Sequence, residues 1–166
     1  IISVLSASYA ADIPQTVRVR ILNIHHPSAI HVSAHSGRIC LPEGIEDFTG
    51  SCTVSLSGTS VVCAMNGRKN QADMIGIRAD KLRIESAAGS RTYEGAVEIS
   101  ADDKELCVVN AAPFEAYVHA AALSEAGELL GKDSSAAAGW EIEFLAAMEI
   151  CIRSYFTANG KRHDDG

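Results

Sequence analysis

The stretch YEGAVEISADDKELCVVNAAPFEAY, residues 93–117, changes from a strand pattern to a helix pattern along its length. Residues 93–100 and 105–109 are rich in the residue types that favour strands. Between them, residues 101–104 (Ala-Asp-Asp-Lys) have the composition of a turn. The first part of the stretch therefore predicts a β-hairpin.

The second part of the stretch carries the signals of a helix start. Asn110 is a residue type that caps helices, and Pro113 suits a first helical turn. Glu115 lies where the helix dipole favours a negative charge, which makes it a helix-start residue rather than a catalyst. We expect a helix over about residues 113–123 and a small, polar loop over residues 127–139.

A second helix is predicted near the end of the sequence, because apolar side chains recur there at the helical period. Glu149 and Arg153 are four residues apart and can form an ion pair on the opposite face. Asn159-Gly160 is a typical helix end. The predicted apolar stripe consists of Phe144, Leu145, Met148, Cys151, Ile152 and Tyr155.

Before the hairpin, strand-like runs alternate with turn signals such as Asn66-Gly67. The expected strands cover residues 17–22, 30–34, 52–56, 60–64 and 82–85. The sequence thus predicts an α+β protein with a β-rich N-terminal part, a hairpin, and two packed helices bordering a cleft. We divide it into residues 1–10, the tail of a signal peptide; residues 11–88, the β-rich part; and residues 89–166, the hairpin and helical part.

The signal-peptide prediction depends on the first residues of the sequence. Residues 1–7 are apolar and small, and the small residues Ser8 and Ala10 precede a polar segment that contains Pro14. This is the small-x-small pattern at which signal peptidase cuts. We therefore expect export to the cell envelope or the exterior, with the mature protein beginning near Ala11; the alternative is a short buried strand.

The composition is that of a folded globular protein, with 47% hydrophobic residues and a net charge of −7. Capture of nucleic acid by charge requires a clustered basic face. The acidic balance gives no indication of one, so we expect no nucleic-acid partner.

Four short segments have an order and spacing that are more specific than any one of them alone. The chain resembles the SpoIID/LytB family (stage II sporulation protein D-like, peptidoglycan-remodelling proteins) in these segments, which together cover residues 91 to about 163. The family pattern is a Tyr-x-Gly strand, a Val-Asn-x-x-Pro-Leu-Glu-x-Tyr turn and helix, a Ser-Glu-Met, and a helix that ends in Ala-Arg-Thr-Tyr. The matching segments are Arg91-Thr92-Tyr93-Glu94-Gly95, then Val108-Val109-Asn110 with Pro113-Phe114-Glu115-Ala116-Tyr117, then Leu123-Ser124-Glu125, and finally Glu143-Phe144-Leu145 through Arg153-Ser154-Tyr155.

The resemblance implies action on the bacterial cell wall. SpoIID-type members are lytic transglycosylases that cleave glycan strands lacking stem peptides, and LytB-type members are described as enhancers of a cell-wall amidase. The family's catalytic glutamate falls on Glu125, and Ser124, Arg153 and Tyr155 are the expected substrate-binding residues. One carboxyl is sufficient because the sugar's own 6-hydroxyl closes onto the anomeric carbon, whereas most glycosidases require a pair. Partial burial beside a flexible loop would suit Glu125 to this role.

The sequence departs from the family pattern at four positions, two of which are Ala146 and Glu149 in place of a lysine and an alanine of the last helix. Ala126 replaces the methionine after the glutamate, and Met148 replaces a glutamine in the last helix, which removes hydrogen-bonding capacity. The leading prediction is cleavage of peptidoglycan glycan strands by a lytic transglycosylase. The alternative is a non-catalytic wall-binding or amidase-enhancing module, for which a cell-wall amidase is a candidate partner. A third reading, an exported structural domain without glycan contact, predicts no shared cleft for Glu125, Arg153 and Tyr155.

Arg153 itself has two readings, which are equally weighted. It is either a cation that faces the substrate or one half of a surface pair with Glu149.

Histidine and cysteine residues do not form a metal-binding pattern. Histidines 25, 26, 31 and 35 lie in strand and turn segments without a carboxylate or cysteine to complete a ligand set. Some SpoIID members bind zinc through a histidine at the place of His163 and further Cys and His residues after it. We therefore expect no metal or other cofactor within residues 1–166, and zinc is possible in a full-length protein. No chemistry is assigned to the five cysteines, and Cys151 is expected to be a buried thiol on the apolar side of its helix.

Overall fold

The computed structural model describes residues 15–22, 24–126 and 138–159, which form two compact units. We call residues Thr16–Pro113 the sheet unit and the part from Phe114 onward the helical unit. The elements are β1 (Thr16–Ile21), β2 (Ala29–Leu41), β3 (Gly44–Ser57), β4 (Ser60–Met65), β5 (Arg68–Ala72), β6 (Met74–Ser86), β7 (Gly89–Asp102), β8 (Glu105–Pro113), α1 (Phe114–Ala126) and α2 (Ala138–Asn159).

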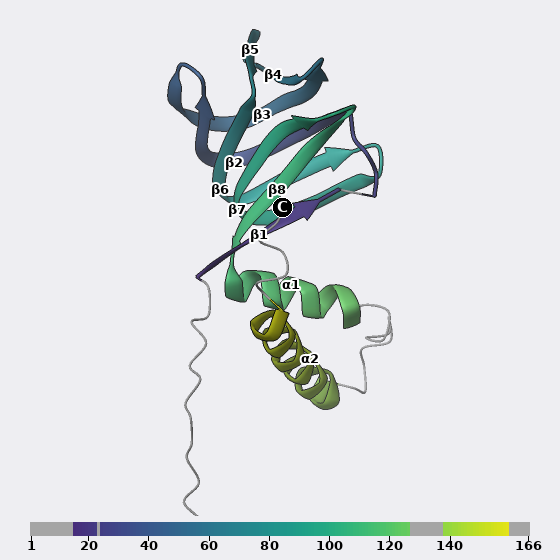
Figure 1. The fold of residues 1–166 in the computed structure, drawn as a ribbon. Coiled ribbons are helices and arrows are strands. Elements are labelled where there is room, and N and C mark those ends of the chain that lie inside the picture. The colour runs from purple at the N-terminus through teal and green to yellow at the C-terminus, as the bar shows by residue number, and fades with distance from the viewer. Residues whose placement is uncertain (1–14, 23, 127–137, 160–166) are drawn as a thin grey trace, which may run out of the picture. The chain divides into compact units, whose positions relative to one another are not determined.

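The sheet unit is one eight-stranded antiparallel sheet (Figure 1), with the strand order β1-β8-β7-β6-β2-β3-β4-β5. Most neighbours in the sheet are also neighbours in sequence and are joined by hairpins. Two pairings are not local: β2 pairs with β6, and β1 pairs with β8, where Thr16 lies opposite Pro113. The first and last strands of the unit are therefore neighbours.

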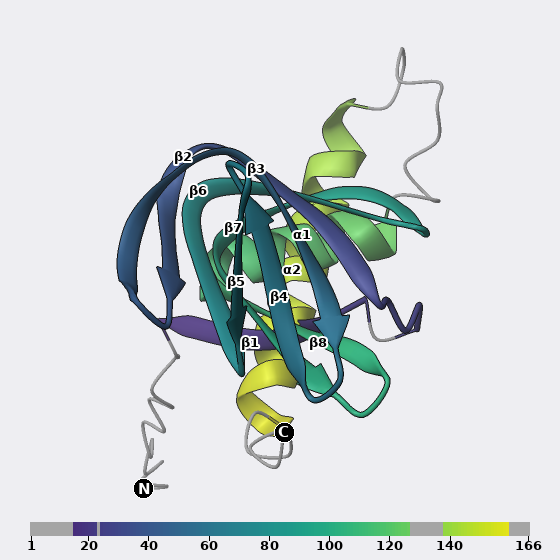
Figure 2. The same ribbon diagram turned by 90° about the horizontal axis from the view of Figure 1, so that it is seen from above.

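The long strands β2, β3, β6 and β7 curl around a common core, as the view in Figure 2 shows. Strand β4 contacts β6 and β7 although it is not their neighbour in the sheet, so the sheet folds over onto itself. Apolar and polar residues alternate along the strands, which buries one face and exposes the other. The largest fully buried side chains of the core are Phe48, Ile39, Ile75, Ile77, Leu82, Ile84 and Ile99.

Two β-bulges lie at the same level of the sheet and increase its curvature. Strand β2 has one extra residue relative to β3 between Ala34 and Gly37, and β6 has one extra residue relative to β7 between Ala79 and Leu82. Gly37 pairs with Ala79, so the two bulges are adjacent. A Cβ atom on Gly37 would lie 2.4 Å from the carbonyl oxygen of Arg78, which explains the glycine.

The hairpin predicted over residues 93–109 is present as β7 and β8, but the predicted role of Asn110 as a helix cap is wrong. Asn110 lies inside β8 and is 7% exposed. Its Nδ2 donates hydrogen bonds to the carbonyl oxygens of Glu94 and Ala96, each at 3.0 Å. Because β8 continues to Pro113 through its pairing with β1, the helix starts only at Phe114.

The residue between those two carbonyls, Gly95, has a φ of 90°. A Cβ atom there would lie 2.3 Å from the carbonyl oxygen of Ala111. The backbone therefore needs glycine at this position, and the amide of Asn110 spans the resulting irregularity.

The helical unit is an antiparallel pair of helices. At the start of α1, the rings of Phe114 and Tyr117 lie 5.2 Å and 6.2 Å from that of Phe156, near the end of α2. The buried face of α1 repeats every four residues and consists of Phe114, Val118, Ala122 and Ala126.

The packed face of α2 is rotated relative to the prediction. Four of the six predicted stripe residues are half-buried (Phe144, Leu145, Met148 and Ile152), as is Phe156. Tyr155 and Cys151, in contrast, are exposed, so the expectation of a buried Cys151 thiol is wrong. Because Phe156 continues the stripe one turn after Ile152, the packed face also includes Glu149 and Arg153, which were predicted on the opposite side.

The fold class is α+β, as predicted, with an antiparallel sheet and two helices. Each predicted strand overlaps a strand of the structure, whereas β5 was not predicted. The predicted signal-peptide tail (residues 1–10), most of the predicted loop (residues 127–137) and His163 lie outside the described residues. Neither described helix combines the length and apolar content that a membrane crossing requires.

Candidate functional site

Four charged or polar side chains connect the two helices of the helical unit. We call Glu115, His119, Glu149 and Arg153 the interhelix network. Arg153 donates from Nη2 to Glu115 Oε2 at 2.5 Å and to Glu149 Oε2 at 3.2 Å. His119 Nδ1 donates to Glu149 Oε1 at 2.9 Å. The network therefore extends along more than one turn of each helix.

Hydrogen bonding within the network shifts the acidity of its members. The hydrogen bond from Arg153 lowers the pKa of Glu115 below its usual range. The pKa of Glu149 is lowered first by its hydrogen bond with His119 and then by that with Arg153. The same bonds, that with Glu115 first, raise the pKa of Arg153. The charged forms of all three groups are thus favoured in the folded helical unit.

Arg153 forms more ion pairs than the sequence indicated. It is paired with Glu149, as one reading expected, and also with Glu115, which is 38 residues away in the sequence. Its side chain is 33% exposed. The spacing of four residues indicated the Glu149–Arg153 pair within α2. No sequence signal indicated that Glu115 and His119 of α1 would face this pair.

Glu125 and Ser124 lie in the last turn of α1 and are exposed. The partial burial expected for Glu125 is therefore not found. Among the residues that the structure describes, no side chain forms an ion pair or hydrogen bond with its carboxylate. The flanking residues Ala122 and Ala126 are fully buried, so the backbone that carries Ser124 and Glu125 is fixed by packing.

The structure does not bring Glu125 together with Arg153 and Tyr155. Arg153 contacts α1 at Glu115, and the antiparallel arrangement places Tyr155 near that same end of α1. Glu125 lies ten residues further along α1, a rise of about 15 Å. Tyr155 is 65% exposed. The predicted site residues thus occupy two ends of the helix pair.

The segments that carry the family resemblance contact one another in two places. Gly95 of the first segment lies beneath the side chain of Asn110 of the second. Glu115 of the second segment forms an ion pair with Arg153 of the last. These four residues therefore have roles in holding each unit together. Ser124 and Glu125, of the third segment, have no such contact within the described residues.

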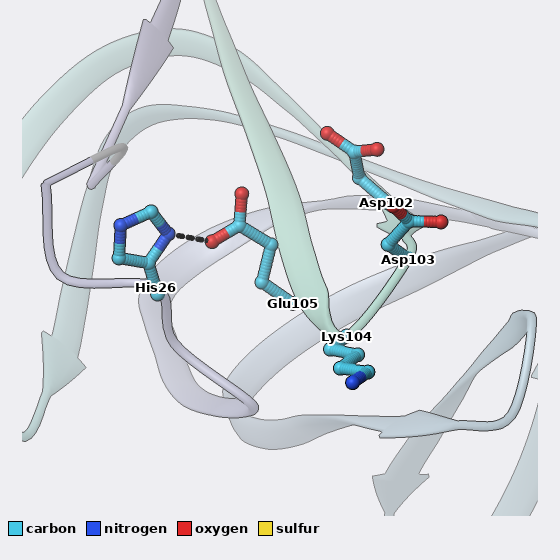
Figure 3. Close-up of a pocket in the computed structure, with 5 residues that line it drawn as sticks. All are labelled: His26, Asp102, Asp103, Lys104 and Glu105. Carbon is cyan, nitrogen blue, oxygen red and sulfur yellow. Dashed lines mark hydrogen bonds and ion pairs between the residues drawn. The ribbon is translucent and has the colours of Figure 1, made fainter.

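A depression of about 500 Å³ on the sheet unit is lined by His26, Asp102, Asp103, Lys104 and Glu105. Figure 3 shows that the imidazole of His26 faces the carboxylate of Glu105, and Nδ1 donates to Oε2. Arg20 donates to the other oxygen of Glu105 at 2.7 Å and pairs with Asp102 at 2.9 Å. These contacts join β1 and the connection that follows it to the β7–β8 turn.

No group of three or more His, Cys, Asp or Glu side chains suited to a metal ion occurs in the described part of the chain. The Nδ1 atom of His31 lies 3.3 Å from the hydroxyl oxygen of Thr53. The five cysteines are free thiols, and Cys52 and Cys63 are buried in the sheet core. The hydrogen bond with Cys63, together with burial, raises the pKa of the Cys52 thiol. Because both side chains are buried among apolar residues of the core, they pack as small hydrophobic groups.

Comparison with known proteins identifies no relative, because no family model, curated protein or solved structure matches this chain.

Proposed function

We propose that this chain is exported, binds peptidoglycan glycan strands and cleaves them as a lytic transglycosylase, with Glu125 as the acid and base. The observation that carries the proposal is the state of Glu125: it is exposed, has no partner among the described residues, and stands on a firmly packed helix. A carboxylate without a structural role at the position where the family resemblance expects the catalyst is a reasonable candidate.

The contacts of the other motif residues support this choice. Asn110 and Glu115 are fully explained by the hydrogen bonds and ion pairs that they form. Removing them would disturb the fold, so a structural reason accounts for their presence. Such a reason does not account for Glu125. Asn110 and Glu115 stabilise the fold through their contacts, whereas Glu125 has no such contact among the described residues. Glu125 is therefore the motif residue best placed to act as the catalyst.

The proposed reaction needs one proton donor at the scissile bond. Protonated Glu125 gives its proton to the glycosidic oxygen as the bond to the anomeric carbon breaks. The 6-hydroxyl of the same sugar then bonds to the anomeric carbon, and its proton returns to the Glu125 carboxylate. The products are a 1,6-anhydro sugar end and a free hydroxyl on the leaving sugar. Water is not consumed, so no second carboxyl is required to activate it.

Tyr155 enters the proposal as a contact for a different part of the strand, whereas Arg153 is held by Glu115 and Glu149. A glycan strand is a linear polymer, and its sugars can extend along the helix pair from Glu125 toward the exposed ring of Tyr155. Aromatic rings are suited to stacking on sugar faces. On this view the predicted cleft is an open path along the helical unit, with Ser124 beside the reacting sugar.

The test incubates the full chain with purified glycan strands stripped of stem peptides, and mass spectrometry measures 1,6-anhydro products. Glu125→Gln is expected to lower the rate about 100-fold or more, the usual contribution of a general acid. Glu143→Gln is the matched control, since Glu143 is an exposed glutamate on α2. Equal product from the Glu125→Gln and wild-type proteins would refute the role of Glu125. Strand binding without any product would leave a non-catalytic wall-binding module.

A further inference from the structure

The paired β-bulges of β2 and β6 form a second depression on the sheet unit, which we call the bulge depression. Its volume is about 320 Å³. Side chains from β2, β6 and β7 surround it, and β2 is far from the other two strands in sequence. Bulges commonly redirect side chains at binding sites. The lining residues are Ser33, Ala34, His35, Lys81, Arg83 and Thr92.

The lining of the bulge depression is cationic and rich in hydrogen-bond donors. Lys81 and Arg83 supply positive charge, and the hydroxyl groups of Ser33 and Thr92 can donate hydrogen bonds. Ser33, Arg83 and Thr92 lie in one row across the sheet, because Ser33 pairs with Arg83 and Arg83 with Thr92. No carboxylate is among the described residues that line the depression. This combination fits an anionic oxygen group.

The cations around the bulge depression are only partly neutralised by the fold. Arg83 Nε contacts Glu85 at 2.9 Å and Ser90 at 2.8 Å, which leaves its Nη atoms free among the described residues. Lys81 is exposed and makes no ion pair with any described carboxylate.

Two more arginines lie one residue pair beyond Gly37 and Ala79, outside the lining of the depression. Arg38 and Arg78 face each other directly in the β2–β6 register, where like charges are destabilising. Asp47 lies opposite Arg38 on β3, Asp80 lies in the β6 bulge, Glu85 pairs with Arg83, and Glu94 lies across from the bulge on β7. The acidic residues around the depression therefore match these four cations in number. The positive charge is confined to the lining of the depression, where Lys81 has no ion-pair partner among the described carboxylates.

We propose that the bulge depression binds carboxylate groups of the glycan strand, an inference that rests on the proposed function. A strand without stem peptides carries one free carboxylate on the lactyl ether of each muramic acid. Lys81 and Arg83 would pair with such a carboxylate, and Ser33 and Thr92 would donate hydrogen bonds to its oxygens. On this proposal an attached stem peptide weakens binding at the depression, because it converts the carboxylate into a neutral amide.

The experiment measures binding of fluorescently labelled, peptide-free glycan strands by anisotropy, with full chains that carry Glu125→Gln so that the strand is not consumed. Lys81→Ser with Arg83→Ser is expected to weaken binding about tenfold, a few-fold for each exposed charge pair. The matched control is Arg68→Ser with Lys69→Ser, which removes the same charge from two exposed residues of β5. Its affinity should stay within about twofold of the parent.

A chemical change to the ligand provides an independent measurement. Converting the strand carboxylates into neutral methylamides should weaken binding by the parent chain about tenfold and leave binding by the Lys81→Ser, Arg83→Ser chain nearly unchanged. The single change Lys81→Ser, at a side chain without partners in the described residues, should act in the same direction with unchanged thermal stability. Excess inorganic phosphate should compete if any oxyanion is accepted, whereas competition by acetate alone indicates a carboxylate site.

The two proposals fail in different ways. If the double variant binds as tightly as the β5 control, or if amidation has no effect, the bulge depression does not bind strand carboxylates, whatever the cleavage assay gives. If the double variant loses binding but the wild-type chain releases no anhydro product, the glycan site stands and the lytic activity does not.

Discussion

Replacing Asn110 with alanine tests the reasoning about the sheet unit most directly. In the structure the Asn110 amide donates two hydrogen bonds of 3.0 Å across the irregularity at Gly95, and the residue is 7% exposed. Alanine removes both bonds and leaves the carbonyl groups of Glu94 and Ala96 without that donor. The backbone pairing of β8 with β1 and β7 does not depend on the side chain, so the fold should survive.

The expected loss follows from the hydrogen bonds. Each contributes about 1 kcal/mol net, and leaving a buried acceptor without a partner adds about 1 kcal/mol or more. Partial access to water offsets some of this, so we expect Asn110→Ala to lower the free energy of unfolding by about 2–3 kcal/mol. With a urea m-value of about 2 kcal/mol/M, the unfolding midpoint should fall by about 1–1.5 M.

The assay is urea unfolding followed by far-ultraviolet circular dichroism. Asn70→Ala is the matched control, because Asn70 lies on the edge strand β5 and its side chain makes no hydrogen bond within the described residues. It should change stability by about 0.5 kcal/mol or less. Asn110→Asp should be at least as harmful as Asn110→Ala at neutral pH, since a carboxylate would face two carbonyl oxygens. Equal midpoints for Asn110→Ala and Asn70→Ala would refute the assigned role.

Two further predictions concern the core and the interhelix network. Phe48→Ala removes a fully buried ring and should lower the free energy of unfolding by about 3–5 kcal/mol in the same urea assay; a loss below about 1 kcal/mol would contradict its place in the core. Hydrogen bonds from Arg153 and His119 lower the pKa values of Glu115 and Glu149, so their stabilising effect is present above the ordinary glutamate pKa of about 4.3 and lost as pH falls below it. Glu115→Gln should therefore flatten the fall in melting temperature between about pH 5 and pH 3, and an unchanged slope would show that the ion pair does not contribute.

The sequence predicted those strands and helices whose signals lie within the segment itself. The hairpin of β7 and β8 was predicted because strand-forming residues flank a polar turn, and both strands are present. Strand β5, Arg68–Ala72, was missed because its sequence RKNQA has little strand propensity and it is held by pairing with β4. The pairing of β2 with β6 joins residues too distant in sequence for any short pattern to indicate.

The role of Asn110 shows how a local signal can mislead. Asparagine before a Pro-containing helix start is a good cap, and the helix does begin nearby. The residue instead belongs to β8, because pairing with β1 extends that strand to Pro113. The local pattern assigned the Asn110 side chain to the helix, but it donates hydrogen bonds to the carbonyl oxygens of Glu94 and Ala96 instead.

Single residues and pairs within one helix of the candidate site could be predicted from the sequence, but contacts between the two helices could not. Spacing within one helix indicated the Glu149–Arg153 pair, which is present. The rotation of α2 about its axis depends on packing against α1, so the sequence did not indicate that Glu115 and His119 would face this pair. The charges of Lys81 and Arg83 were visible in the sequence, but the two bulges that gather them with Ser33 and Thr92 were not.

Because Thr16 lies opposite Pro113, the first strand of the sheet unit pairs with its last. During synthesis β1 leaves the ribosome first, yet its backbone N–H and C=O groups have no strand partner until β8 has emerged. Closing a loop of this length has a large entropic cost, and contacts so distant in sequence slow folding. We therefore expect the hairpins to form early and β1 to dock in a late, slow step. Until then β1 and the open side of β8 are unpaired edges that invite association with other chains.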